Sequence, residues 1–167
     1  MVLKNATILV VDDDADVLTA LRLLLKPLVL KIETERNPNN ITSLIQKNNY
    51  DVVILDMNFN GIVNTGNEGI FWLNKIKQIN PDIAVILMTA YAEIDLAIKG
   101  LKEGAADFLV KPWKNEKILN TITNILKSEK KNIKKEESFS SYSTSIIGES
   151  NLMQDVFLKF LLVKKFH

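Results

Sequence analysis

The sequence predicts an α/β protein, a three-layer sandwich in which a doubly wound, five-stranded parallel sheet lies between two layers of helices. Short apolar runs rich in β-branched residues recur through most of the 167-residue chain, as in strands that are buried on both faces. Segments with apolar residues at helical spacing separate these runs. Strands that alternate with helices favour a parallel sheet whose right-handed crossovers cover both faces.

The chain begins with a strand, a helix and a second strand. Residues 7–11 (TILVV) form a continuously apolar run that ends at three consecutive aspartates. Leucines at helical spacing follow; Asp14 or Asp16 is the expected N-cap of this helix, and Pro27 closes it. The second strand, over residues 29–34, has a weaker and more alternating pattern.

A short helix, a third strand and a long loop come next. Asn37 and Pro38 are typical of an N-cap and a first-turn proline, so we expect a helix that ends near Lys47. The third strand, DVVILD, is apolar without interruption until it reaches Asp56. A loop rich in glycine and asparagine follows, and then a helix over about residues 68–79.

The last two strands also end in polar residues. Residues 83–88 (IAVILM) form a buried strand that runs into Thr89 and Ala90. A helix over about residues 93–103, capped by a glycine, leads to the fifth strand, ADFLV, which ends at a Lys-Pro pair. A long helix with an apolar stripe begins near Asn115 and extends past the sheet.

Composition excludes several classes of protein. An apolar fraction of 47% suffices for a core, and a net charge of +1 gives no reason to expect nucleic-acid binding by bulk electrostatics. The absence of cysteine excludes disulfides, thiolate metal sites and cysteine nucleophiles. The sequence shows neither a signal peptide nor an apolar run long enough to span a bilayer, so we expect a cytoplasmic protein without membrane contact.

The composition changes past Lys127. We expect a first domain over residues 1–127, a polar, partly helical and serine-rich linker over 128–145, and an apolar segment over 146–167 that is too short to be a domain. We interpret the basic run Lys130–Lys135 as a solvated helix face rather than a DNA contact.

Polar residues stand where four of the five strands end: Asp12 and Asp13 after the first, Asp56 after the third, Thr89 after the fourth and Lys111 after the fifth. The carboxyl ends of parallel strands meet at one edge of the sheet, where ligands bind in open α/β folds. Three carboxylates held close repel one another, and hard oxygen ligands in an open site favour Mg²⁺ as the ion that relieves this repulsion. With an ammonium and a hydroxyl opposite, the set suggests phosphoryl transfer onto Asp56 as the nucleophile.

Each of these residues also has a purely structural interpretation. An acidic pair after a strand is as typical of a helix N-cap as of a metal site, a threonine there is common in turns, and Lys-Pro is common in loops. Their joint placement at one edge of the sheet, with no such residue at the other, favours the functional interpretation.

The motifs VVDDD, VILDM, LMTA and DFLVKPW, in this order and spacing, resemble those of the receiver domain of bacterial two-component response regulators. The resemblance covers about residues 6–126 and implies a flavodoxin-like sheet of strand order 2-1-3-4-5. It implies that Asp12 and Asp13 hold Mg²⁺ together with Asp56 and the backbone carbonyl of Asn58. It also implies that Asp56 accepts a phosphoryl group from a histidine kinase.

The same resemblance assigns the residues around the phosphoryl group. Lys111 would pair with the acyl phosphate, through a cis peptide bond to Pro112. Thr89, with Ala90 beside it, would move to bind the new phosphate, and Phe108 would be the aromatic side chain that follows it inward.

Two positions depart from the family pattern. The proline that usually stands four residues after the acceptor is Asn60, and the loop after it is longer than usual. Phe108 has no hydroxyl, so a hydrogen bond from it cannot fix an inward or an outward state. Tyr91, at the rim of the site, and Asn58 could set how readily water reaches the phosphoryl group.

The function implied is a phosphorelay switch rather than a turnover enzyme. Phosphorylation would shift the face made by the fourth helix, fifth strand and fifth helix between two packings, and so control homodimerisation and a transcription-activating output domain. The tail IIGESNLMQDVF resembles the opening of the AAA+ ATPase domain of nitrogen-regulator (NtrC)-type activators, but no phosphate-binding GxxxxGK[ST] motif follows. Contacts with the alternative sigma factor, RNA polymerase or DNA would therefore belong to output domains that these residues do not include.

Two other functions are compatible with the same acids. The first is a Mg²⁺-dependent phosphohydrolase of the haloacid-dehalogenase type with Asp56 as nucleophile, but its general acid would have to be Asn58. The second is a metal-free pseudo-receiver that serves only as an interaction module. The complete set of acids, hydroxyl and lysine argues against the second function.

Overall fold

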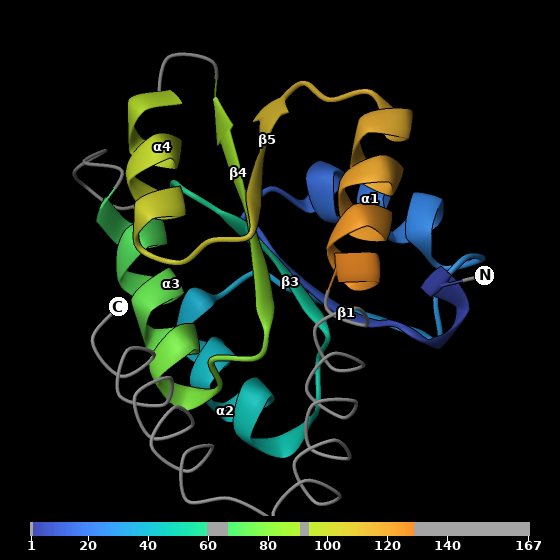
Figure 1. Cartoon of the computed structure of the whole chain (residues 1–167), viewed down its shortest axis with the longest axis horizontal. Helices are drawn as coiled ribbons and strands as arrows, with labels where there is room; N and C mark the ends of the chain where they lie inside the picture. Colours follow the sequence, from blue (N-terminus) through green and yellow to red (C-terminus); the bar gives the residue numbers. More distant parts are fainter. Residues whose placement is uncertain (1, 60–66, 91–93, 129–167) are drawn as a thin grey trace, which may run out of the picture. The chain divides into compact units, whose positions relative to one another are not determined.

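The computed structural model of the chain describes residues 2–59, 67–90 and 94–128, which form an α/β sandwich (Figure 1). In chain order its elements are β1 (Thr7–Val11), α1 (Ala15–Leu25), β2 (Lys31–Glu35), α2 (Ile41–Lys47), β3 (Val52–Asp56), α3 (Asn67–Ile79), β4 (Ala84–Ala90), α4 (Ile94–Lys102) and β5 (Asp107–Lys111). A last helix follows over residues 115–128, and 3₁₀ turns precede β1 (Val2–Asn5) and α2 (Pro38–Asn40). Apart from Ser128, the expected linker and C-terminal segment lie outside the described residues.

The sheet confirms the predicted class and strand order. Its five strands are all parallel and follow the order β2-β1-β3-β4-β5. Helix α1 and helix 115–128 cover one face, and α2, α3 and α4 cover the other (Figure 1). Because β1 and β3 are parallel neighbours, the residues at their carboxyl ends meet at the same edge of the sheet.

Alternate side chains of each central strand belong to two separate core layers. In β1, Ile8 and Val10 pack with α1 and helix 115–128, whereas Leu9 and Val11 pack with α2 and α3. All four side chains are fully buried. The strand therefore needs apolar residues on both of its faces, which explains the uninterrupted run in the sequence.

The N-cap of α1 agrees with the sequence, whereas several strand boundaries differ from the prediction by one or two residues. Asp14 caps α1 by accepting a hydrogen bond from the Asp16 backbone N–H at 2.8 Å. Strand β2 begins at Lys31 rather than at residue 29, because the backbone N–H of Val29 still bonds the Leu25 carbonyl in the turn after α1. Strand β4 extends to Ala90, since its ladder with β5 continues to the end of that strand.

None of the helices in the described part of the chain combines the length and the apolar character that spanning a bilayer requires.

A glycine near the start of α3 lets this helix approach the chain directly after Asp56. The Gly69 backbone N–H donates to the Met57 carbonyl at 3.1 Å, and a Cβ at residue 69 would lie 2.6 Å from the Met57 Cα. Backbone atoms cannot move aside as a flexible side chain can. Any larger residue therefore displaces α3 or the segment that follows β3.

We predict that Gly69→Ala lowers the free energy of unfolding by about 2 kcal/mol, because overpacking of this kind typically costs more than the ~1 kcal/mol that alanine gains in helix propensity. Urea unfolding followed by circular dichroism measures the difference. The exposed Gln78→Ala on the same helix is the control and should change stability little. A Gly69→Ala protein at least as stable as wild type would show that the close approach is not required.

Candidate functional site

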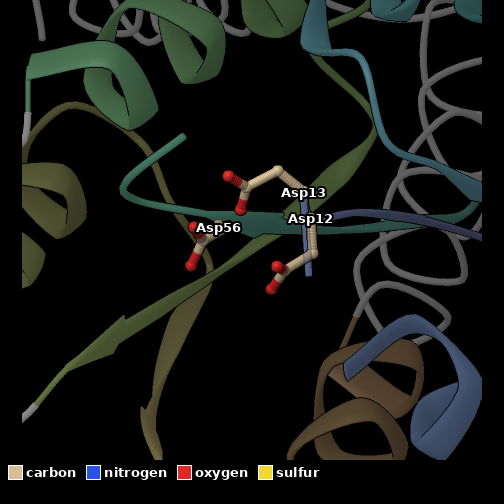
Figure 2. Close-up of side chains that lie close together, drawn as sticks. All are labelled: Asp12, Asp13 and Asp56. Atoms are coloured by element: carbon tan, nitrogen blue, oxygen red, sulfur yellow. The ribbon is translucent and has the colours of Figure 1, made fainter. Parts of the chain in front are cut away.

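Three aspartates from two neighbouring strands gather at the carboxyl edge of the sheet (Figure 2). Asp12 and Asp13 directly follow β1, and Asp56 is the last residue of β3. Carboxylate oxygens of the three residues lie within 4.8 Å of one another. The structure thus brings together the acids that the sequence analysis grouped.

Two of these acids, Asp12 and Asp56, are buried. Asp12 is 0% exposed and Asp56 only 5% exposed, whereas Asp13 is half-buried. A buried carboxylate is unfavourable unless hydrogen bonds or an opposite charge compensate it. The compensating groups around the two buried acids therefore decide what the site can do.

The ammonium of Lys111 bridges the two buried carboxylates. Its Nζ lies 2.7 Å from Asp12 Oδ2 and 2.7 Å from Asp56 Oδ1. Lys111 ends β5, two strands away from β3 in the sheet, and its long side chain reaches the acids from there. One ammonium thus pairs with two carboxylates, so the cluster of three aspartates keeps a net negative charge.

Backbone donors hold the remaining carboxylate oxygens of the buried pair. Asp12 Oδ1 accepts from the Asp14 N–H at 2.9 Å, and Asp56 Oδ2 accepts from the Asn58 N–H at 3.2 Å. Both donors lie two residues after the acid that they bond, so each strand end turns back onto its own carboxylate. These bonds fix the orientation of the acids before any ligand arrives.

Burial raises the pKa values of Asp12 and Asp56 more than the bonds from Lys111 and the backbone lower them. Burial, followed by the charge of Asp12, raises the pKa of Asp56 to about 6, although the bond from Lys111 lowers it. Burial also raises the pKa of Asp12, against the opposing bonds from Lys111 and Asp14. For Lys111 burial acts downward, but the hydrogen bonds to both acids outweigh it and raise the pKa of its ammonium.

The predicted switch residues lie on β4 and β5. Thr89 is 1% exposed near the end of β4, where it pairs with Val110, the neighbour of Lys111. Its hydroxyl donates to the Ala90 carbonyl at 3.2 Å, and Ala90 itself is exposed. Phe108 on β5 is half-buried and packs against the core layer beneath α3.

Of three further predicted positions, Pro112 and Asn58 lie within the described residues and Tyr91 does not. The peptide bond between Lys111 and Pro112 is cis, as expected. Asn58 lies two residues after the end of β3 and is half-buried. Tyr91 and Asn60 lie outside the described residues.

The sequence analysis did not include Arg36, which contacts the β1–α1 loop. Its guanidinium donates to the backbone carbonyl of Asp13 from Nη2 at 3.0 Å and from Nε at 3.3 Å. The predicted second strand ended at Thr34, whereas the ladder continues to Glu35, opposite Val11. The predicted strand order 2-1-3 could have indicated this contact, because it places the residue after β2 beside the residues after β1.

The donor set suits a hard divalent cation. The three side chains offer oxygen only, without imidazole or thiolate, and one of them is partly open to solvent. Mg²⁺ prefers such oxygen ligands and retains several waters. The acidic cluster is therefore compatible with Mg²⁺.

Comparisons with known proteins agree with this geometry. The profile of the family described as the response regulator receiver domain matches residues 8–123. The transcriptional regulatory protein ZraR of Klebsiella oxytoca is 33% identical over 123 residues, which is 74% of this chain and 27% of that protein. The DNA-binding transcriptional regulator NtrC of Salmonella typhimurium is 28% identical over 160 residues, which is 93% of this chain and 32% of that protein. The chain thus spans only about a third of the length of these curated relatives.

A solved structure supports the fold independently. The N-terminal signal receiver domain of a two-component system response regulator from Bacteroides fragilis matches with a TM-score of 0.67 and 49% sequence identity. The match covers 74% of this chain and 98% of that one. The part that matches is therefore nearly the whole of a receiver domain.

The raised pKa of Asp56 predicts how stability depends on pH without metal. A carboxyl whose pKa is higher when folded stabilises the protein below its unfolded value, near 4, and this contribution is lost as pH rises through about 6. In EDTA we therefore expect Asp56→Asn to exceed wild type in unfolding free energy at pH 7 by up to about 3 kcal/mol, and the difference to shrink toward pH 4.

Urea unfolding of both proteins between pH 4 and pH 7.5 measures this difference. Asp95→Asn, which removes an exposed carboxylate from α4, is the matched control. A wild-type protein that is more stable than Asp56→Asn at pH 7 would contradict the stated electrostatic balance.

Proposed function

The chain belongs to the response regulator receiver domain family, and on this basis we propose that it is a phosphorelay switch in which Asp56 accepts a phosphoryl group from a histidine kinase. The observation that carries the proposal is the joining of Asp12 and Asp56 by Lys111 at two distances of 2.7 Å, with Asp13 beside them. Acids, cation and open edge together form a site for a charged oxyanion and its counter-ion.

Asp56 is the nucleophile of the proposed reaction. One carboxylate oxygen attacks the phosphorus, the new O–P bond forms, and the bond to the donor breaks with its electron pair left on the donor. With a phosphohistidine donor the leaving group is the imidazole nitrogen. The raised pKa of about 6 still leaves Asp56 mostly ionised at pH 7, as a nucleophile must be.

Asp12, Asp13, Asp56 and the backbone carbonyl of Asn58 are the proposed ligands of Mg²⁺. The ion would neutralise charge on the phosphoryl oxygens during transfer. Lys111 would hold one phosphoryl oxygen, since its ammonium already lies within hydrogen-bond distance of the attacking carboxylate.

The output of the switch is the face formed by α4, β5 and helix 115–128. Thr89 would turn its hydroxyl from the Ala90 carbonyl to the new phosphoryl group, and Phe108, which packs against the core, would follow it inward. Two apolar side chains on α4, Ile98 at 42% and Leu101 at 36% exposure, support a role of this face in homodimerisation.

A phosphohydrolase is less well supported by the same site. Haloacid-dehalogenase-type hydrolases need a general acid two residues after the nucleophile, and Asn58 stands there. The Asn58 backbone N–H bonds Asp56 Oδ2, so this position serves to orient the acceptor. We therefore propose that the domain is a switch rather than a turnover enzyme.

The rest of the chain fits a regulator with an output domain. We propose a receiver over residues 1–127, a linker over 128–145 and the start of an AAA+-like output domain over 146–167. The relatives named as transcriptional regulators align with 74–93% of this chain and support a role in transcription regulation. Contacts with sigma factor, RNA polymerase and DNA would then be made by an output domain beyond these residues.

We predict that acetyl phosphate and Mg²⁺ add one phosphoryl group to the wild-type chain, seen as a single labile adduct by intact mass spectrometry. The adduct should be absent in Asp56→Asn and in EDTA. Asp13→Asn should still form it but at least about 10-fold more slowly, since one ligand charge is lost. No adduct on the wild-type chain would overturn the proposal, and an adduct that persists in Asp56→Asn would assign another acceptor.

We also predict that Mg²⁺ and beryllium fluoride, an analogue of the phosphoryl group, shift the chain from monomer to dimer in sedimentation velocity. Ile98→Asp should weaken this association at least about 10-fold, because it would bury an unpaired charge in the interface. Leu23→Asp is the control, since Leu23 is 73% exposed on α1, on the other side of the sheet. Equal dimerisation of Ile98→Asp and wild type would place the interface elsewhere.

A further inference from the structure

Arg36 joins the end of β2 to the loop that carries Asp12 and Asp13. Two of its guanidinium nitrogens, Nη2 at 3.0 Å and Nε at 3.3 Å, donate to the carbonyl oxygen of Asp13. The residues lie 23 positions apart in sequence, so the contact depends on the pairing of β1 with β2. A planar guanidinium with two donors on one acceptor restricts that peptide in direction as well as in distance.

The contact completes a series of hydrogen bonds along the loop. The Asp12 N–H donates to the Glu35 carbonyl at 3.1 Å, which ends the β1–β2 ladder. The Asp14 N–H then returns to Asp12 Oδ1 at 2.9 Å, and Asp14 caps α1. The Asp13 carbonyl and the Asp14 N–H belong to one peptide group, so Arg36 and the Asp12 carboxylate hold this peptide from its two sides, directly after the half-buried Asp13.

The acidic side chain next to Arg36 in sequence, Glu35, makes its hydrogen bonds elsewhere. The carboxylate of Glu35 accepts from the Asn37 N–H at 2.7 Å and from the Asn40 amide at 3.0 Å, so it is engaged in the turn after β2. Among the described residues, the ion pairs found do not include Arg36. Its polar contact is therefore with a backbone carbonyl rather than with a carboxylate.

From this arrangement we infer that Arg36 is a positioning residue: its fork on the Asp13 carbonyl holds the Asp13 carboxylate in the geometry that binds the divalent cation. The inference rests on the proposed function, since it concerns the cation of that site. It assigns a role in the site to a residue outside the acids, threonine and lysine.

Two physical effects of Arg36 on cation binding have opposite signs. As a positive charge near three carboxylates, the guanidinium repels Mg²⁺, so removing it would tighten binding by electrostatics alone. As a positioning group it orders a ligand in advance, so removing it would weaken binding. The direction of the change in affinity therefore distinguishes positioning from charge.

We predict that Arg36→Ala weakens Mg²⁺ binding about 10-fold, the lower end of the effect of losing a group that orients a metal ligand. Arg36→Lys should lie between Arg36→Ala and wild type, because one ammonium keeps the charge but not the fork. Titration of Trp113 fluorescence with Mg²⁺ measures the affinity, since Trp113 follows Pro112 and packs against the core beneath the site. The rise in Tm with saturating Mg²⁺ is a second measurement and should fall in parallel.

The matched control is Arg22→Ala, which removes the same charge from the exposed face of the last turn of α1. A repeat in 0.5 M NaCl screens long-range electrostatics, and the loss in Arg36→Ala should persist there. Unchanged or tighter Mg²⁺ binding by Arg36→Ala, with the wild type binding normally, would overturn the positioning role and leave the proposed function intact. A wild-type chain that shows no Mg²⁺ binding would overturn both.

Discussion

The bridge from Lys111 to two buried aspartates is the interaction on which the site depends. Asp12 and Asp56 are both nearly inaccessible, and a single ammonium at 2.7 Å from each provides the opposite charge for the pair. Without it, two anions would lie side by side in a medium where repulsion is several times stronger than in water. The bridge also ties β5, an edge strand of the sheet, to β1 and β3.

The parallel topology makes this bridge possible. In the order β2-β1-β3-β4-β5, the ends of β1 and β3 are adjacent, and β5 is close enough for a lysine to reach across β4. Each strand must be apolar on both faces, so chemistry is confined to the residues at its end. The buried strands form the core, and the polar residues at their carboxyl ends form the site. Thr89 lies near the end of β4, the strand that the Lys111 side chain crosses to reach the acids.

Much of this arrangement could be predicted from the sequence, because it is set by local patterns. The apolar runs before Asp12 and Asp56 identify buried strands, and alternation with helices orders them into one parallel sheet. The contact of Arg36 was missed although the strand order pointed to it, because it depends on where β2 ends, and a half-exposed strand has a weak pattern. The close approach of Gly69 to Met57 was likewise not predicted, since a glycine within a helical pattern does not indicate which residue it contacts.

The charge of the cluster explains why a switch built on it would respond to phosphorylation. Three carboxylates and one ammonium sum to −3 + 1, a formal charge of −2 that one divalent cation balances. A phosphoryl group on Asp56 replaces one negative charge by nearly two, so the balanced site would become negative by about one charge. Nearby donors must then compensate this excess, and the Thr89 hydroxyl is the buried one on the adjacent strand. The proposed movement of Thr89 thus follows from the negative charge that phosphorylation would add beside buried carboxylates.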